Sequence, residues 1–120
     1  MAKLPMGELE SAIMEVLWDA HSSLTSGQVH DVLSVDRPLA YTTVLTTLVR
    51  LWRKGRLARE PEGRAFAYKA CLSREEFAAK RMSEDLVNAR DQPLALSYFV
   101  ASLKPRDRIR LRQLLEAEQD

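Results

Sequence analysis

The chain has 120 residues, 46% hydrophobic and 29% charged, and these proportions predict one small globular domain, or one with an appendage, rather than a disordered chain. Its single cysteine, Cys71, excludes an internal disulfide and a cysteine-based metal cluster. The sequence has neither an apolar run long enough to cross a membrane nor, in its first seven residues, one typical of a signal peptide, so we expect a cytoplasmic protein without membrane insertion.

The formal net charge of +1 is unevenly distributed. Residues 37–69 include eight basic and two acidic side chains, a net charge of +6, whereas the remainder has a net charge of −5. Such a concentration is typical of a phosphate-binding surface, but a solvated charged face has the same composition. Charge alone leaves both interpretations open.

Two amphipathic helices are expected in the first third of the chain. Apolar residues recur at helical spacing over residues 7–20. A capping box from Thr25 to Gln28 then predicts a short second helix. Its apolar face is expected to hold Val29, Val32 and Leu33.

A third helix, expected over residues 40–54, has the most informative pattern. Its predicted core face holds Tyr41, Val44, Leu48 and Leu51. The residues predicted to lie away from that face are Thr42, Thr43, Thr46, Arg50 and Arg53. A solvated helix face usually carries Glu and Lys, yet residues 37–59 include no acidic side chain. Threonine hydroxyls and methyls form a compact surface that fits between groove walls, which favours nucleic-acid binding.

A basic hairpin is expected after this helix. Gly55 stands where a helix C-cap glycine belongs. Residues 65–70 alternate as in a half-buried strand, with Phe66 and Tyr68 inward, and residues 61–64 predict a turn. Three helices and a hairpin indicate a mainly α winged helix-turn-helix with a small β-hairpin wing, and Arg59 and Arg64 lie near the wing tip.

The chain returns to helix with a second capping box at Ser73. The segment 94–103 is apolar on nearly every side, and the short C-terminal helices have too little mass to bury it, so we expect a second copy of the chain to cover it. The sequence thus predicts a winged-helix domain over 1–72 and a helical dimerisation domain over 73–120. The expected interface residues are Leu94, Leu96, Tyr98, Phe99, Leu103, Leu111, Leu114 and Leu115.

Several short motifs, in their order and spacing, carry a family resemblance. They are Gly7-Glu8-Leu9-Glu10, Leu17-Trp18, Leu39-Ala40-Tyr41-Thr42-Thr43-Val44, Arg50-Leu51, Lys54-Gly55 and Gly63-Arg64 with Tyr68. With them the chain resembles, over nearly its whole length, the penicillinase-repressor (BlaI/MecI) family of winged-helix regulators. The resemblance implies a homodimer that represses β-lactamase or other resistance genes. It also implies inactivation by cleavage in the dimerisation domain, in response to a membrane sensor of β-lactams.

Two departures from the family pattern bear on regulation. The scissile Asn-Phe pair of the best-known relatives falls near Ser97, Tyr98 and Phe99, the candidate cleavage region, where this chain has no Asn. The mode of inactivation therefore stays open. Copper-responsive relatives carry a C-terminal cysteine cluster, and its absence from this sequence excludes copper sensing by that route.

The expected partner is a palindromic double-stranded DNA operator, and we expect no cofactor and no metal. Thr42, Thr43 and Thr46 are the candidates for base contacts. The candidates for phosphate contacts are Arg50, Arg53, Lys54, Arg59 and Arg64.

Two other functions are less consistent with the sequence, and Cys71 has two possible roles. An enzyme is disfavoured because His21, His30 and Asp31 come without a glycine-rich phosphate loop or metal-ligand spacing. A winged helix that binds a protein instead of DNA is disfavoured by the basic stretch and the threonine-rich third helix. Cys71 is expected to be a small core or edge residue, with a redox switch as the alternative.

Overall fold

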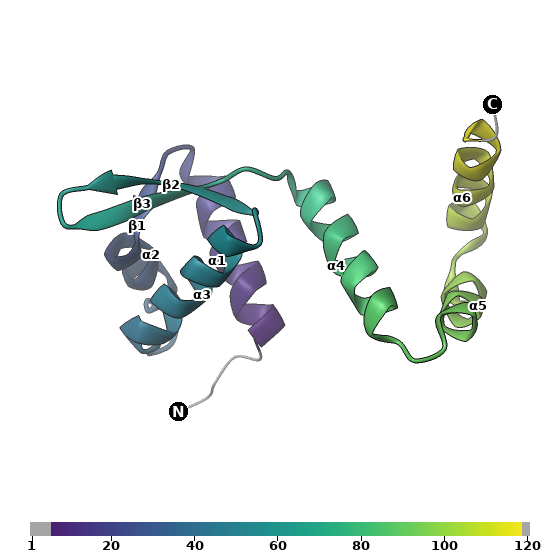
Figure 1. Ribbon diagram of the computed structural model, residues 1–120, viewed down its shortest axis with the longest axis horizontal. Coiled ribbons are helices and arrows are strands. Elements are labelled where there is room, and N and C mark those ends of the chain that lie inside the picture. Colours follow the sequence, from purple (N-terminus) through teal and green to yellow (C-terminus); the bar gives the residue numbers. More distant parts are fainter. Residues whose placement is uncertain (1–5, 119–120) are drawn as a thin grey trace. The chain divides into compact units, whose positions relative to one another are not determined.

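The structure is a computed structural model that describes residues 6–118, so most of the segment examined for a signal peptide lies outside the described residues. Contacts divide the chain after Phe77 into two compact units. The first unit holds α1 (Met6–Ala20), β1 (Leu24–Thr25), α2 (Ser26–Leu33), α3 (Tyr41–Arg53), β2 (Leu57–Glu62), β3 (Ala65–Ala70) and the start of α4 (Arg74–Asn88) (Figure 1). The second unit holds the rest of α4, α5 (Gln92–Ser102) and α6 (Pro105–Ala117).

Both predicted capping boxes are confirmed. Thr25 Oγ1 accepts a hydrogen bond from the Gln28 N–H at 3.2 Å, and Gln28 Oε1 accepts one from the Thr25 N–H at 2.9 Å. Ser73 Oγ accepts from the Glu76 N–H at 3.1 Å, and Glu76 Oε1 accepts from the Ser73 N–H at 3.0 Å. Each box satisfies two amides that the helix start leaves unpaired, which is why α2 and α4 begin where they do.

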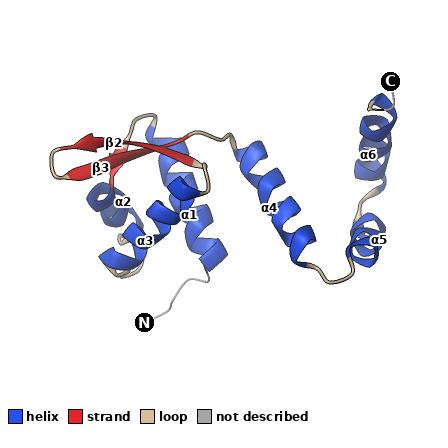
Figure 2. Ribbon diagram, viewed as in Figure 1, coloured by secondary structure: helices blue, strands red, loops and turns tan. Residues whose placement is uncertain are grey.

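A three-stranded antiparallel sheet with the order β1-β3-β2 completes the first unit. Figure 2 shows its β2–β3 hairpin. The hairpin was expected, but β1 was not, because two residues are too few to show alternation. The strands pair as far as Glu62 and Ala65, so the turn is tighter than the predicted 61–64 segment. Gly63, with φ of 62°, makes this tight turn without the strain that a Cβ would add.

The core of the first unit lies among α1, α2, α3, the sheet and the first turn of α4. Its buried members are Leu9, Ile13, Met14, Leu17, Val29, Val44, Leu48, Leu51, Leu57, Tyr68 and Phe77. Three predicted core residues are instead exposed, Val32 (53%), Tyr41 (43%) and Phe66 (39%). They lie on the expected faces, but beyond the part of each face that a neighbouring element covers.

A buried ion pair lies beside this core and was not predicted. Arg56 Nη1 lies 3.7 Å from Glu10 Oε2, and Lys54 Nζ lies 3.7 Å from Glu10 Oε1. Glu10 and Arg56 are both buried, and the Arg56 guanidinium lies 5.5 Å from the centre of the Phe77 ring. The Glu10 carboxylate therefore connects α1 to the chain between α3 and β2.

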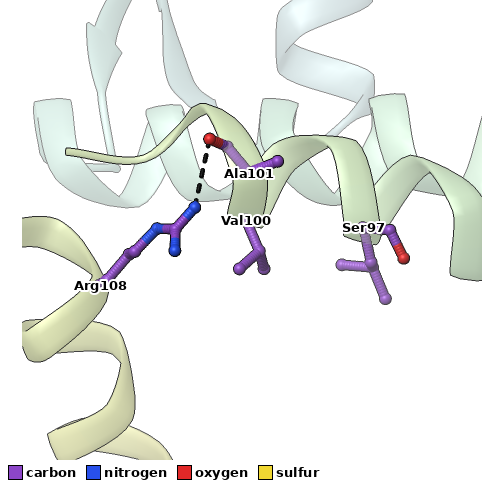
Figure 3. A pocket seen from close by; sticks show the side chains of 5 residues that line it. Ser97, Val100, Ala101 and Arg108 are labelled. Atoms are coloured by element: carbon purple, nitrogen blue, oxygen red, sulfur yellow. Dashed lines mark hydrogen bonds between the residues drawn. The ribbon is translucent and has the colours of Figure 1, made fainter. Parts of the chain in front are cut away.

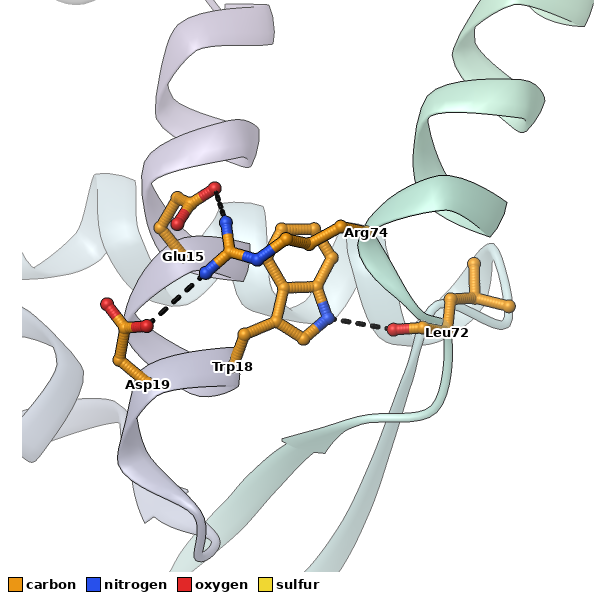
Figure 4. A network of polar contacts seen from close by, with 5 residues as sticks. All are labelled: Glu15, Trp18, Asp19, Leu72 and Arg74. Atoms are coloured by element: carbon orange, nitrogen blue, oxygen red, sulfur yellow. Dashed lines mark hydrogen bonds and ion pairs between the residues drawn. The ribbon is translucent and has the colours of Figure 1, made fainter.

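A polar network fastens the first turn of α4 to α1 (Figure 4). Trp18 Nε1 donates to the carbonyl oxygen of Leu72 at 2.8 Å, and the Arg74 guanidinium lies 4.9 Å from the centre of the Trp18 ring. Arg74 also pairs with Glu15 and Asp19. Its hydrogen bond to Glu15 raises the pKa of Arg74 above its ordinary value.

The second unit is helical and leaves most of its apolar side chains exposed. Asp91 caps α5 by accepting from the Leu94 N–H at 3.0 Å, and Arg108 of α6 donates to the carbonyl oxygen of Ala101 at 3.3 Å (Figure 3). An apolar groove of about 550 Å³ is lined by α4 and α5 residues that include Met82, Leu86 and Phe99. Among residues 6–118, no helix combines the length and the apolarity needed to cross a bilayer.

Candidate nucleic-acid interface

The helices α2 and α3 are joined by polar contacts that set the angle of α3. Ser26 Oγ and the Tyr41 hydroxyl share a hydrogen bond of 2.7 Å. His30 Nε2 donates to the carbonyl oxygen of Leu39 at 2.6 Å, and the His30 and Tyr41 rings meet edge to face with centroids 5.8 Å apart. These contacts explain why Tyr41 is half out of the core, because its hydroxyl is bonded to α2. These contacts could not be predicted from the residue types alone.

The outward face of α3 displays the three threonines that the sequence analysis selected. Thr42, Thr43 and Thr46 are all exposed, while Thr47 is buried at 2%. Thr47 Oγ1 donates to the carbonyl oxygen of Thr43 at 2.8 Å, so its hydroxyl is satisfied within the helix. The N-cap of α3 is Ala40, whose methyl group cannot accept from the first amides of the helix. The exposed N-terminal half of α3 thus offers threonine hydroxyls and methyls beside a helix start with positive partial charge.

The five basic residues predicted to contact phosphates have different environments. Arg53 in the last turn of α3 and Arg64 at the hairpin turn are exposed, and Arg50 is half-buried. Lys54 is paired with Glu10. The Arg59 guanidinium lies between two aromatic rings.

Trp52, which the sequence analysis did not select, provides one of those rings. The Cζ atom of Arg59 lies 3.6 Å from the centre of the Trp52 ring and 3.9 Å from the centre of the Phe66 ring. The exposure of Phe66 follows from this position, because its ring packs on Arg59 and not in the core. A tryptophan near the end of a helix followed by an arginine-bearing strand was the available signal, but such a pattern occurs in many proteins without a stack.

Comparison with known proteins places this geometry in a family. The family model described as Penicillinase repressor matches residues 6–117. The chain belongs to the penicillinase repressor family. The family consists of transcriptional repressors, so this member is a repressor and not an enzyme.

Individual relatives support the assignment of this repressor to the family. The chain is 41% identical over 104 residues to Transcriptional regulator BlaI of Mycobacterium tuberculosis, covering 83% of this chain and 75% of that protein. It is 33% identical over 78 residues to the Penicillinase repressor of Bacillus licheniformis, covering 64% of this chain and 60% of that protein. It also matches the solution structure of the DNA-binding domain of the repressor BlaI with 34% identity and a TM-score of 0.53, covering 63% of this chain and 93% of that one. The predicted family and the winged-helix fold are therefore confirmed.

Outside the winged helix, this repressor exposes the apolar residues predicted to form a dimer interface. On α5 the exposed fractions reach 69% for Tyr98 and 42% for Phe99. Leu94, Leu96, Leu114 and Leu115 are also exposed, whereas Leu103 and Leu111 are half-buried. Ser97, in the candidate cleavage region, is exposed and donates to the carbonyl oxygen of Pro93 at 3.0 Å.

The histidine and cysteine side chains considered for catalysis or redox chemistry do not form a site. His30 is bonded to Leu39, as described above, and its Nδ1 lies 3.9 Å from Asp31 Oδ1. Cys71 Sγ lies on the surface, 3.5 Å from the carbonyl oxygen of Gly55. Within residues 6–118, no three His, Cys, Asp or Glu side chains come together as a metal-binding group.

Proposed function

We propose that this repressor binds double-stranded operator DNA as a homodimer, with α3 in the major groove. The observation that carries the proposal is the exposed threonine face of α3, flanked by Arg53 and followed by a hairpin with Arg64 at its turn. The similarity to a structure described as the DNA-binding domain of the repressor BlaI supports it. A helix enters the major groove of B-DNA, where each base pair shows a distinct pattern of donors and acceptors.

Base recognition and phosphate binding are assigned to different residues in this proposal. Thr42, Thr43 and Thr46 contact base edges, where a threonine methyl packs on a thymine methyl and its hydroxyl donates or accepts. The phosphate contacts are made by Arg50, Arg53, Lys54 and Arg64, which set the affinity and the register without reading sequence. Arg59 belongs to the same basic set, but its guanidinium is already stacked between two rings.

Dimerisation is assigned to residues 73–120, and DNA binding to residues 1–72. The support is the exposed apolar surface of α5, because a helix that is apolar on most sides needs to be covered on more than one face. Two identical units related by a two-fold axis read a palindromic operator, and a dimer binds it more tightly than a single unit does.

We further propose which genes are regulated and how the repressor is inactivated. The name Penicillinase repressor supports control of β-lactamase or other resistance genes. We propose that the protein lies in the cytoplasm with its DNA. We also propose that a membrane-sensor protease induces the regulated genes by inactivating the repressor. Cleavage in the 97–99 region of α5 would cut the proposed dimer surface.

The decisive experiment is a gel shift of the purified protein on the DNA upstream of its own gene, with random DNA as the control. The wild type should retard the upstream DNA at concentrations that leave random DNA unbound. Arg64→Ala should weaken both by the same factor and reduce the slope of log affinity against log salt concentration by about one.

Thr46→Ala tests the base contacts. It should relax base preference, by about 1–3 kcal/mol at one position, in a selection from randomised operators. Unchanged selectivity for Thr46→Ala, or a loss for Arg64→Ala confined to the specific site, would contradict these assignments.

A further inference from the structure

Arg59 makes contacts that its charge alone does not indicate. Its flat guanidinium is stacked between Trp52 of α3 and Phe66 of β3, with Cζ 3.6 Å and 3.9 Å from the two ring centres. Its Nη1 also donates to the Tyr68 hydroxyl at 3.4 Å. We call Trp52, Arg59 and Phe66 the aromatic clasp. All three positions lie in the first unit, on α3, β2 and β3.

The clasp connects the last turn of α3 to the hairpin close to its turn. Phe66 is paired with Pro61, one residue pair before the Glu62–Ala65 pair that closes the hairpin. Arg64 lies in that turn, so the clasp acts near the residue proposed to bind phosphate. The Arg59 pairing partner on β3 is Tyr68, whose ring is fully buried, which fixes the other end of the arginine side chain to the core.

We infer that Arg59 is a positioning residue: the aromatic clasp holds the wing at a set distance from α3, so that Arg64 and the threonine face contact DNA together. The inference rests on the proposed function. Two cation–π contacts on one guanidinium favour the docked wing over a displaced one, and Arg stacks on ring faces in a way that the compact ammonium of Lys does not reproduce. A wing docked for only part of the time lowers the apparent affinity by the docked fraction.

A direct phosphate contact by Arg59 predicts different behaviour for the same substitutions. Arg59→Lys keeps the positive charge and removes the planar group, so it retains most of the affinity if Arg59 binds phosphate. The clasp predicts that Arg59→Lys loses as much operator affinity as Arg59→Ala does. Phe66→Leu is the matched variant, because it removes one ring and leaves every charge in place. It should weaken operator binding and, through the lost Arg64 contact, also lower the salt dependence. A direct phosphate contact by Arg59 predicts little change in either quantity for Phe66→Leu.

The test is a double-mutant cycle on operator binding with Arg59→Ala and Arg64→Ala, accompanied by Arg59→Lys and Phe66→Leu. We expect Arg59→Ala and Arg59→Lys each to weaken binding by up to about tenfold, which is the size of two exposed cation–π contacts converted to an equilibrium constant. Phe66→Leu should weaken binding by a smaller factor, because it removes only one of the two contacts. Arg64→Ala should then have a much smaller effect in the Arg59→Ala background than in the wild type, because an undocked wing no longer delivers Arg64.

Hydrogen exchange of the unbound proteins separates this inference from the proposed function. Amides of the β2–β3 hairpin should exchange faster in Arg59→Lys and Phe66→Leu than in the wild type, while α1 amides keep their protection. If wild-type protein fails to bind its upstream DNA, the proposed function fails, yet this exchange measurement still tests the clasp. Additive losses in the cycle, near-wild-type affinity for Arg59→Lys, or unchanged hairpin exchange would each overturn it.

Discussion

Replacing Glu10 by Gln should lower the free energy of unfolding of the winged-helix unit by more than the small change in side-chain shape suggests. The Glu10 carboxylate lies 3.7 Å from Arg56 Nη1 and 3.7 Å from Lys54 Nζ. The exposed fractions of the side chains are 9% for Glu10, 5% for Arg56 and 36% for Lys54. The Arg56 pair is therefore a buried ion pair, while the Lys54 pair is partly screened by water.

The expected loss follows from that burial. At such a separation and an effective dielectric constant of 20, the attraction between Glu10 and Arg56 amounts to about 4 kcal/mol, but burial offsets it by several kcal/mol per ion. The intact pair thus adds little net stability. Removing one partner leaves the desolvation of Arg56 uncompensated by the Glu10 charge, which typically destabilises by about 3–5 kcal/mol. Because Gln keeps the shape and can still accept a hydrogen bond, we expect the lower end, about 3 kcal/mol, or a fall of roughly 10–20 °C in Tm.

Urea unfolding followed by circular dichroism measures this loss. Glu8→Gln is the matched control, since Glu8 is exposed on the same helix, and its effect should stay below about 1 kcal/mol. Adding Arg56→Met to Glu10→Gln should restore part of the stability, because the buried charge is then gone. A loss below about 1 kcal/mol for Glu10→Gln, or a double variant less stable than Glu10→Gln alone, would refute the reasoning.

Three further predictions address the dimer, α3 and the backbone. Phe99→Asp should convert the protein to a monomer in sedimentation and abolish tight operator binding; a dimer that still binds would contradict the assignment of α5. Thr47→Ala should lower the free energy of unfolding by about 1 kcal/mol, because a buried methyl and a hydrogen bond are lost, and should leave base preference unchanged. Thr46→Ala should instead alter base preference and leave the free energy of unfolding nearly unchanged. Gly55→Ala, at φ of 80°, should destabilise the protein by about 1–2 kcal/mol, while Gly27→Ala inside α2 should stabilise it by about 0.5 kcal/mol. Thermal unfolding in which both variants shift Tm in the same direction would be inconsistent with this account.

The sequence by itself determined the elements whose signals are local. Both capping boxes formed as predicted, because each needs only two residues three apart in the chain. The helix α3 begins and ends within one residue of its expected bounds, and Gly55, with φ of 80°, directly follows the C-cap residue Lys54, as a helix-ending glycine should. The exposure of Thr42, Thr43 and Thr46 also followed from helical periodicity, since three core residues on the opposite face fix the orientation.

Only the tertiary structure decided which parts of those faces are covered and which charged groups meet. Val32 and Phe66 have the predicted periodicity, yet no local pattern states how far a neighbouring helix or strand extends over them. The Glu10–Arg56 pair joins residues 46 positions apart, and the aromatic clasp brings α3 against both strands of the hairpin. Such contacts depend on how whole elements pack, because spacing along the chain sets the direction of a side chain and not what it meets.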